Sequence, residues 1–378
     1  MSVQRDLEQI INSRLFKKKV IIIIGPRQVG KTTLLQIIGN SNSRKRILLN
    51  CDEPDIRRRL DFPTSSQLKA LIGDAEFIFI DEAQRVRDIG ITLKLMIDTI
   101  PDKQIIVTGS SALELSNTIN EPLTGRKFEY KLFPFSFGEL SKDRGYLEES
   151  RLIEHRMVYG MYPDVVNNQG NEREILGNLA SSYLYKDIFE FQDIRKPEII
   201  EKLLQALALQ LGSEISFNEL SQLIGIDSAT IQRYIDLLEK SYIIFHLRSF
   251  SRNVRNELKK SRKIYFYDNG IRNALISDFK PINLRNDAGA LWENFLLSER
   301  LKRNQYSQNY VNSYFWRTTQ QQEIDYIEEK DDLLNCYEFK WNPAKKAFLS
   351  TTFSSNYPKS SFKVINTDNF NEFIGAIG

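Results

Sequence analysis

Residues 25–32 read Gly-Pro-Arg-Gln-Val-Gly-Lys-Thr, a G-x-x-x-x-G-K-T pattern that directly follows the apolar run Val20–Ile24. Such loops bind phosphates, because consecutive backbone N–H groups point inward and the following helix N-terminus adds a positive dipole. Lys31 is placed to reach the β- and γ-phosphates of a nucleotide, and the Thr32 hydroxyl is placed to bind Mg²⁺. We therefore expect ATP and Mg²⁺ to bind here, through the loop residues Gly25, Pro26, Arg27, Gln28, Val29, Gly30, Lys31, Thr32 and Thr33.

Two adjacent acids follow a second apolar run, Phe77–Ile80. Asp81 is expected to hold Mg²⁺, directly or through water. Glu82 is expected to polarise the attacking water, because its carboxylate lies just past the strand end, where the γ-phosphate lies. Alternatively, the two acids could be a strand end that is simply exposed to solvent. Because these acids follow a phosphate-binding loop, we favour the nucleotide site.

A third apolar run, Gln104–Thr108, also ends in small polar residues. Ser110 or Thr108 could hydrogen-bond the γ-phosphate or the attacking water, and Ser110 could equally cap the following helix. Arg126 lies shortly before the next predicted strand. It could act as an arginine finger on the ATP of a neighbouring subunit, or it could be a surface arginine. The sequence leaves both questions open.

The elements that position these residues follow from the alternation of apolar runs and helical patterns. It predicts a P-loop α/β sandwich with a parallel sheet over residues 1–140. Residues 141–212 lose the strand pattern and are predicted to form a helical lid or linker. Residues 213–268 and 269–378 are predicted as a third and a fourth unit. The expected strands of the first unit are Val20–Ile24, Arg46–Asn50, Phe77–Ile80, Gln104–Thr108 and, as a candidate fifth, Phe128–Phe133.

Several short motifs accompany the phosphate-binding loop. They are Ile-Asp-Glu-Ala-Gln at 80–84, Thr-Gly-Ser-Ser at 108–111, Leu-Thr-Gly-Arg at 123–126, and the segments 133–139 and 160–164. Together they resemble a prokaryotic AAA+ ATPase family over nearly the whole chain. The resemblance implies ATP hydrolysis and assembly into a ring of identical subunits, with a hexamer favoured. It also implies a C-terminal domain of unknown function.

The middle of the chain has helix-turn-helix spacing. Ser216 and Glu219 form a capping box at the start of one amphipathic helix. Residues 225–227 make a turn, and Thr230–Glu239 form a second amphipathic helix. This pattern predicts a helix-turn-helix.

Two strand-like runs, Tyr242–Leu247 and Lys263–Tyr267, follow these helices and flank a basic loop, which is typical of a winged helix. Such a module would contact DNA through its second helix and through phosphate contacts of the loop. The alternative is a protein-interaction or lid-packing module with a solvated basic hairpin. Asp268 is interpreted as a turn and helix-capping residue. The candidate DNA-binding residues are Gln232, Arg233, Arg252, Arg255, Lys259, Lys260 and Arg262.

The C-terminal region carries an acid on one predicted strand, Asp325, and a Glu-x-Lys pattern on the next, where Glu338 and Lys340 share a face. This arrangement resembles the PD-(D/E)xK nucleases. It implies that Asp325 and Glu338 hold a second Mg²⁺ or Mn²⁺, and that Lys340 orients or activates water. Glu293, on the preceding helix, is at the position of a further acid. Alternatively the fold has lost cleavage, and Glu338 and Lys340 form an ion pair on an edge strand.

Composition limits the remaining choices. The chain has 378 residues, enough for two to four domains, and its net charge of +3 does not by itself indicate nucleic acid. Two cysteines provide no disulfide framework, which predicts a reducing compartment. We find no apolar run long enough for a membrane helix and no signal-peptide pattern at the N-terminus. We therefore expect a cytoplasmic protein.

Three functional hypotheses follow. The leading one is an AAA+ ATPase that hydrolyses ATP to bind, translocate on or remodel DNA, including branched DNA. The second is an ATP-regulated, metal-dependent DNA nuclease. The third is a nucleotide-switched regulatory ATPase that binds a protein partner and carries an inactive nuclease-like scaffold.

Overall fold

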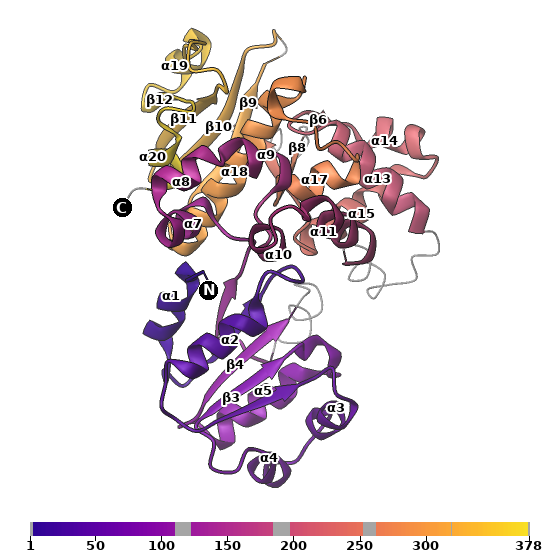
Figure 1. The fold of residues 1–378 in the computed structure, drawn as a ribbon, viewed down its shortest axis with the longest axis vertical. Helices are drawn as coiled ribbons and strands as arrows, with labels where there is room; N and C mark the ends of the chain where they lie inside the picture. The colour runs from indigo at the N-terminus through magenta and orange to yellow at the C-terminus, as the bar shows by residue number, and fades with distance from the viewer. Residues whose placement is uncertain (1–2, 110–121, 184–196, 252–261, 319, 377–378) are drawn as a thin grey trace. The chain divides into compact units, whose positions relative to one another are not determined.

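The computed structural model describes residues 3–109, 122–183, 197–251, 262–318 and 320–376 (Figure 1). These residues form two compact units. The N-terminal unit holds the described residues up to Pro134 together with Lys240–Tyr242, and the C-terminal unit holds the others. Among the described helices, none combines the length and the apolar character needed to cross a bilayer.

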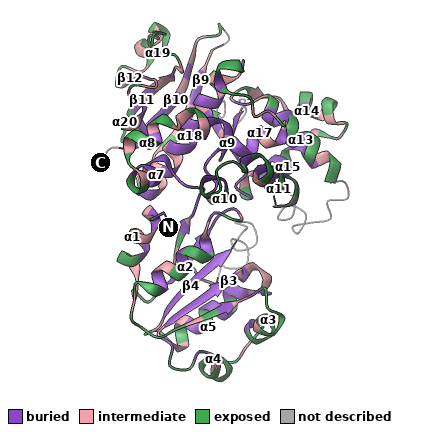
Figure 2. Ribbon diagram, viewed as in Figure 1, coloured by how far each residue is buried: buried purple, intermediate pink, exposed green. Residues whose placement is uncertain are grey.

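The N-terminal unit is built on a five-stranded sheet with the order β2-β3-β4-β1-β5, in which all neighbours are parallel. Its β1, β3 and β4 are buried along their whole length, as Figure 2 shows for β3 and β4, which explains the apolar runs Val20–Ile24, Phe77–Ile80 and Ile105–Val107 within them. The five predicted strands are confirmed. Their bounds are β1 Val20–Ile24, β2 Arg46–Asn50, β3 Phe77–Asp81, β4 Gln104–Gly109 and β5 Lys127–Lys131.

The fifth strand ends earlier than the predicted Phe128–Phe133. Leu132 N still donates to Ile24 O at 2.8 Å, but the carbonyl oxygen of Leu132 packs against Gly25. The chain therefore leaves the sheet to support the loop that follows β1. The helices of this unit are α1 Asp6–Arg14, α2 Lys31–Asn40, α3 Pro54–Leu60, α4 Ser65–Ile72, the 3₁₀ turn Ala83–Arg85 and α5 Ile89–Thr99.

The first part of the C-terminal unit is helical, which confirms the helical pattern predicted after the first sheet in the part that the structure describes. Ser136 and Glu139 form a capping box that starts the first of these helices. The helices are α7 Phe137–Arg144, α8 Tyr146–Arg151, α9 Ile153–Tyr159, α10 Pro163–Asn167, α11 Glu172–Asn178, the π-helical turn Leu179–Tyr183 and α13 Pro197–Leu209. The two helices that were predicted to form a helix-turn-helix are present as α14 Phe217–Ile224 and α15 Ser228–Lys240.

A seven-stranded sheet forms the rest of the unit, with the order β12-β11-β10-β9-β7-β8-β6. Its β7 pairs in parallel with β9, at Arg248–Tyr314 and Ser249–Phe315. The strands predicted for the wing therefore share one sheet with the strands of the region predicted to be nuclease-like, across the predicted boundary at residue 268. The strand bounds are β6 Glu214–Ile215, β7 Ile244–Ser249, β8 Arg262–Phe266, β9 Asn312–Arg317, β10 Glu323–Lys330, β11 Leu333–Phe339 and β12 Ser360–Ile365.

Aromatic side chains join the helices of this unit. Trp292 stacks on Phe295 at 5.8 Å between ring centroids, and both contact Phe370. Phe137 of α7 meets Phe295 and Phe370 edge to face. The remaining helices are α17 Asn269–Leu275, the 3₁₀ turn Ile282–Leu284, α18 Ala288–Tyr306, α19 Thr351–Asn356 and α20 Phe370–Ile374.

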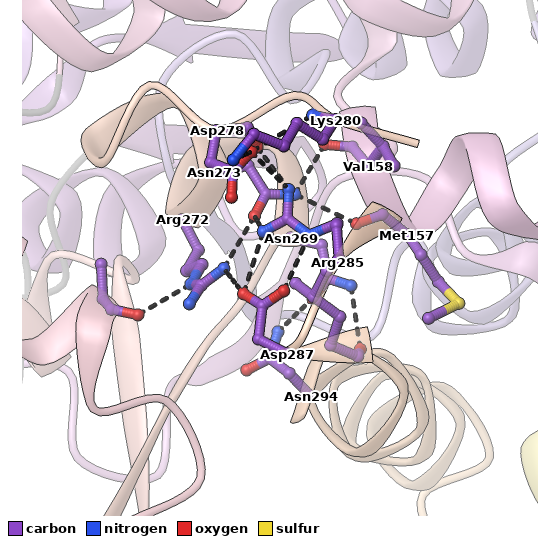
Figure 3. Close-up of polar contacts among 12 residues, drawn as sticks. Met157, Val158, Asn269, Arg272, Asn273, Asp278, Lys280, Arg285, Asp287 and Asn294 are labelled. Carbon is purple, nitrogen blue, oxygen red and sulfur yellow. Dashed lines mark hydrogen bonds and ion pairs between the residues drawn. The ribbon is translucent and has the colours of Figure 1, made fainter. Parts of the chain in front are cut away.

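A buried polar network sets the start of α18 (Figure 3). Arg272 and Arg285 both donate to Asp287, and Asn273 donates to the carbonyl oxygens of Met157 and Val158. Burial alone would raise the pKa of Asp287, but the hydrogen bonds from the two arginines lower it to about 2. The network links α9, α17 and the entry to α18.

The segment 160–164 has a structural role at the same place. Gly160 has φ +70°, and a Cβ atom there would lie 2.0 Å from Asp268 Oδ1. Asp268 accepts hydrogen bonds from Met161 N at 2.7 Å and from Ile271 N at 3.2 Å. The second bond caps α17, which confirms the predicted capping role of Asp268.

Candidate functional site

The phosphate-binding loop lies between β1 and α2, as its pattern requires. Gln28 and Gly30 both have left-handed backbone, with φ of 61° and 94°. Left-handed residues in such a loop turn successive N–H groups toward one concave side, which suits an anion. Lys31, the first residue of α2, is 5% exposed and donates from Nζ to Gly25 O at 2.9 Å and to Pro26 O at 2.8 Å. Its ammonium group therefore lies at the loop itself.

Gly25 and Gly30 are needed for different reasons. A Cβ atom on Gly25 would lie 2.1 Å from Leu132 O, so that any other residue would displace backbone. Around Gly30 there is room for a Cβ atom, but its left-handed φ favours glycine.

The acids at the end of β3 are connected to this loop by hydrogen bonds. Thr32 Oγ1 donates to Asp81 Oδ2 at 2.7 Å, and Thr108 Oγ1 donates to Asp81 Oδ1. The Thr108 hydroxyl also accepts from Glu82 N at 3.2 Å. Adjacent carboxyl ends of parallel strands thus bring together the residues predicted from three separate motifs. Ser110, the other predicted candidate on this strand end, lies outside the described residues.

Glu82 is half-buried and held by a neighbour that the sequence analysis did not single out. Gln84 Nε2 donates to Glu82 Oε2 at 2.6 Å. Glu82 itself has φ 55°, in the left-handed region that is uncommon for a residue with a side chain. At this turn, the bond from Gln84 fixes one of the two carboxylate oxygens of Glu82.

Cys51 lies beside these acids, at the end of β2. Its N–H donates to Asp81 O at 2.9 Å. Burial, with smaller contributions from the negative charges of Asp81 and Asp52, raises the pKa of the Cys51 thiol to about 12. The thiol is therefore in its protonated, weakly nucleophilic form at neutral pH.

Arg126 lies at the amino ends of the parallel strands, whereas the phosphate-binding loop lies at their carboxyl ends. Its carbonyl oxygen accepts from Val20 N at the start of β1, whereas the phosphate-binding loop follows the end of β1. The five residues of β1 separate these two ends, which corresponds to about 16 Å. The Arg126 side chain is about half exposed and lies 3.5 Å from Asp98. Arg126 therefore does not serve the loop of its own subunit, and its role toward a neighbour stays a prediction.

The comparisons with known proteins agree with this geometry. Residues 17–141 match a family model described as an AAA domain, which supports an AAA-type ATPase. Residues 150–282 and 288–376 match two domains of unknown function, DUF8612 and DUF4143. An AAA-type P-loop domain is thus followed by two domains without an assigned role.

The relatives found are uncharacterized proteins. One from Mycobacterium tuberculosis is 28% identical over 332 residues, which cover 86% of this chain and 71% of the relative. One from Methanocaldococcus jannaschii is 27% identical over 360 residues, which cover 89% and 78%. One from Haemophilus influenzae is 28% identical over 305 residues, which cover 75% and 74%. These matches extend the likeness beyond the AAA domain.

The four predicted nuclease-like residues interact with one another in the C-terminal unit. Lys340 Nζ donates to Glu338 Oε1 at 2.7 Å, which is the ion pair of the alternative, and Asp325 Oδ2 accepts from Phe339 N at 2.8 Å. The expected edge strand is wrong, however, because β11 lies between β10 and β12. Burial raises the pKa of Asp325 well above its usual range, and the charges of Glu293 and Glu338 raise it further. The three acids are thus close enough to repel one another.

Two residues of β8 complete this acidic cluster and were missed from the sequence. Tyr265 OH donates to Glu293 Oε1 at 2.5 Å. Lys263 Nζ lies 2.5 Å from Glu323 Oε1 and 3.6 Å from Glu293 Oε1, and the lysine side chain is 4% exposed. Lys263 lies in a predicted wing strand, and nothing in the sequence indicated that its side chain would be buried against Glu293 and Glu323.

The cluster contains its own cation. Within the described parts of the chain, no three His, Cys, Asp or Glu side chains are grouped so that they could hold one metal ion. Burial would lower the pKa of Lys263, but the charges of Glu293 and Glu323 outweigh it and raise the pKa above its usual value. Lys263 therefore stays charged and balances these acids, so metal binding here stays a prediction.

The predicted DNA-binding residues are only partly described. Gln232 and Arg233 are exposed on α15. Arg262 lies 3.8 Å from Asp236 and over the ring of Phe217, so it is engaged within the fold. Residues 217–240 contain four acidic and two basic side chains. The basic loop residues Arg252, Arg255, Lys259 and Lys260 lie outside the described residues.

Proposed function

We propose that the N-terminal unit binds ATP with Mg²⁺ and hydrolyses it. The observation that carries this proposal is the bond from Thr32 to Asp81, which joins the phosphate-binding loop to the acids of β3. A hydroxyl and a carboxylate side by side are oxygen ligands that suit Mg²⁺. The bound ion would neutralise negative charge on the phosphate oxygens.

The chain's own residues then take distinct roles. Lys31 exchanges its bonds to Gly25 O and Pro26 O for the β- and γ-phosphates. Glu82 accepts a hydrogen bond from the attacking water and polarises it, and Gln84 keeps the Glu82 carboxylate in place. Thr108 orients Asp81 and fixes the backbone of Glu82.

Two variants separate ATP binding from turnover. Lys31→Ala should weaken ATP binding, because the phosphate-directed charge is lost. Glu82→Gln should keep binding and lower turnover by about a hundredfold or more, because only the group that polarises water is lost. If both variants lose ATP binding equally, the role of Glu82 is wrong.

We further propose that hydrolysis serves to bind, translocate on or remodel DNA. The helix-turn-helix order of α14 and α15 supports this, as do the exposed Gln232 and Arg233 on the second helix. We also propose a homo-oligomeric ring, with a hexamer favoured. In such a ring Arg126, distant from its own loop, would meet the ATP of a neighbour.

The first experiment measures the ATPase rate with and without single-stranded, duplex and four-way-junction DNA, with Glu82→Gln as the control. Strong stimulation by one form, weakening steeply with salt, supports a DNA-coupled ATPase. A flat response combined with no DNA binding at low salt would reject the DNA role. Slow, DNA-insensitive hydrolysis with nucleotide-dependent binding of a protein would favour a regulatory ATPase instead.

A metal-dependent nuclease is the second candidate function. It is favoured by one observation, the interaction of Glu293, Asp325, Glu338 and Lys340 in one cluster. Nicking of DNA with Mg²⁺ or Mn²⁺ that disappears in Asp325→Ala would support it. Nicking that persists in this variant would be attributed to contamination.

A further inference from the structure

Arg5 reaches the phosphate-binding loop from a part of the chain that no motif marks. It is 4% exposed, directly before α1. Its guanidinium donates from Nη1 to Val29 O at 2.8 Å and from Nη2 to Phe133 O at 2.6 Å. The AAA domain match begins at residue 17, so Arg5 lies before it. We propose that Arg5 is a positioning residue that holds the loop in its ATP-binding shape, an inference that rests on the proposed ATPase function.

Peptide geometry explains how one bond to a carbonyl positions a donor. The peptide group between Val29 and Gly30 is planar and trans, so that its carbonyl and its N–H point in opposite directions. Arg5 holds the carbonyl oxygen of Val29. The N–H of Gly30 is therefore directed away from Arg5. A phosphate-binding loop works through such N–H groups, so Arg5 sets the direction of one of them.

The second bond of Arg5 fixes the loop to the chain that follows β5. Phe133 O accepts from Arg5, and the neighbouring Leu132 O packs against Gly25, where a Cβ atom would lie only 2.1 Å away. The first residue of the loop thus rests on Leu132 by direct contact. Val29, near its other end, is tied to Phe133 through the guanidinium. Two donors in a fixed fork are needed for this, and lysine cannot reproduce them.

The position of Arg5 is itself secured by packing. Leu7 and Ile11 of α1 are buried, and α1 contacts α2, the helix that begins at Lys31. The packing of α1 on α2, the helix that follows the loop, therefore holds Arg5 close to the loop. This gives α1 a role in nucleotide binding although it carries no phosphate ligand.

The test compares the affinity for a fluorescent ATP analogue in the full chain and in Arg5→Met and Arg5→Lys. We expect binding about tenfold weaker in Arg5→Met, as loss of a charged hydrogen bond implies, and an intermediate loss in Arg5→Lys. The KM for ATP should rise while kcat at saturating ATP changes by less than about twofold, because Asp81 and Glu82 are untouched. A general loss of structure would instead lower kcat.

The matched control is Arg14→Met, at the end of α1, the helix that Arg5 precedes. Arg14 lies over the ring of Phe128 at 5.3 Å, and its loss should leave ATP affinity unchanged. If Arg5→Met fails to fold, Arg5→Lys carries the test, with faster amide hydrogen exchange expected at Gly30.

Wild-type affinity and unchanged exchange in Arg5→Lys, with Lys31→Ala impaired, would overturn the role of Arg5 alone. If the wild-type chain itself does not bind ATP, the proposed ATPase function fails as well, and the two failures are thus distinguished.

Discussion

Asp81 accepts hydrogen bonds from two threonines that come from different elements, Thr32 at the start of α2 and Thr108 at the end of β4. Each carboxylate oxygen therefore has a defined direction. This arrangement leaves Glu82, the next residue, free to serve a different role, since its own carboxylate is held by Gln84. The two neighbouring acids thus have different hydrogen-bond partners, which fits the separate roles proposed for them.

Replacing Thr108 by valine tests this assignment. Thr108→Val removes the bond to Asp81 and leaves Glu82 N without its partner, so unfolding free energy should fall by about 1–3 kcal/mol and ATP turnover should fall as well. Urea unfolding and the ATPase rate measure the two effects. Thr92→Val is the control, because Thr92 is buried in the same unit and bonded only to Leu60 O in the contacts described. Equal loss of turnover in both variants would contradict a specific role of Thr108.

The acidic cluster predicts a pH dependence of stability. The pKa of Asp325 is raised in the folded chain, mainly by burial. The folded state therefore holds a proton that the unfolded state releases above the ordinary carboxyl range. Stability from this group is present at low pH and is lost as pH rises toward the raised pKa.

Asp325→Asn should remove this decrease of the unfolding free energy with rising pH, because asparagine does not titrate. The amide oxygen can still accept from Phe339 N. Relative to wild type, the unfolding free energy of the variant should therefore increase between about pH 5 and about pH 8. Urea titrations at both pH values measure the difference, in EDTA so that no metal contributes. Asp331→Asn, in the exposed turn after β10, serves as the control. A difference that is the same at both pH values would show that Asp325 does not titrate as inferred.

At the scale of elements, the turn after α9 requires a glycine at position 160, because Asp268 packs against it. Gly160→Ala would place a Cβ atom 2.0 Å from Asp268 Oδ1 at a left-handed φ, so we expect a loss of at least about 3 kcal/mol in unfolding free energy. Gly170→Ala is a matched comparison, since Gly170 also has a positive φ, of 96°, but nothing lies within 4 Å of its Cβ position. That variant should lose only about 1 kcal/mol, from backbone strain. Similar losses in urea unfolding would mean that the Asp268 contact is unimportant.

The two sheets were predictable to different degrees. In the N-terminal unit, β1 matches the predicted residues, because a buried parallel strand gives an unbroken apolar run. The edge strand β2 also matches, although only Leu49 of it is buried. In the C-terminal unit, α19 was not predicted. Its one buried residue, Phe353, packs on Phe250 and Trp316, which are distant in the sequence. A helix held by one aromatic side chain leaves almost no periodic signal.

At the scale of the whole molecule, the seven-stranded sheet makes the middle and the C-terminal regions depend on each other. The segments 150–282 and 288–376 match separate family models, yet β7 of the first pairs with β9 of the second. Asn294 of the second match also donates to Phe266 O at 3.0 Å and to Asn269 Oδ1, both in the first match. The regions therefore share both a sheet and a buried polar network.

A truncation tests this dependence. A fragment of residues 135–287 lacks β9, so β7 loses a neighbour and the aromatic contacts of α18 are removed. We expect it to lack a cooperative thermal transition by circular dichroism, whereas residues 135–378 should keep one. A sharp transition in the shorter fragment would show that the middle region is an independent domain.

The sequence by itself determined the proposed nucleotide site. The loop at 25–32, the acids at the end of β3 and the strands that carry them are predicted from local sequence patterns, because each depends on neighbours in the chain. Tertiary structure decided the rest. Arg5 meets Val29 and Phe133 across 24 and 128 residues, and Lys263 enters an acidic cluster built from α18 and β10. A single basic residue gives no sequence pattern from which its partners could be predicted. Only the folded chain brings the charged side chain of Arg5 or Lys263 close to these partners and excludes water around it.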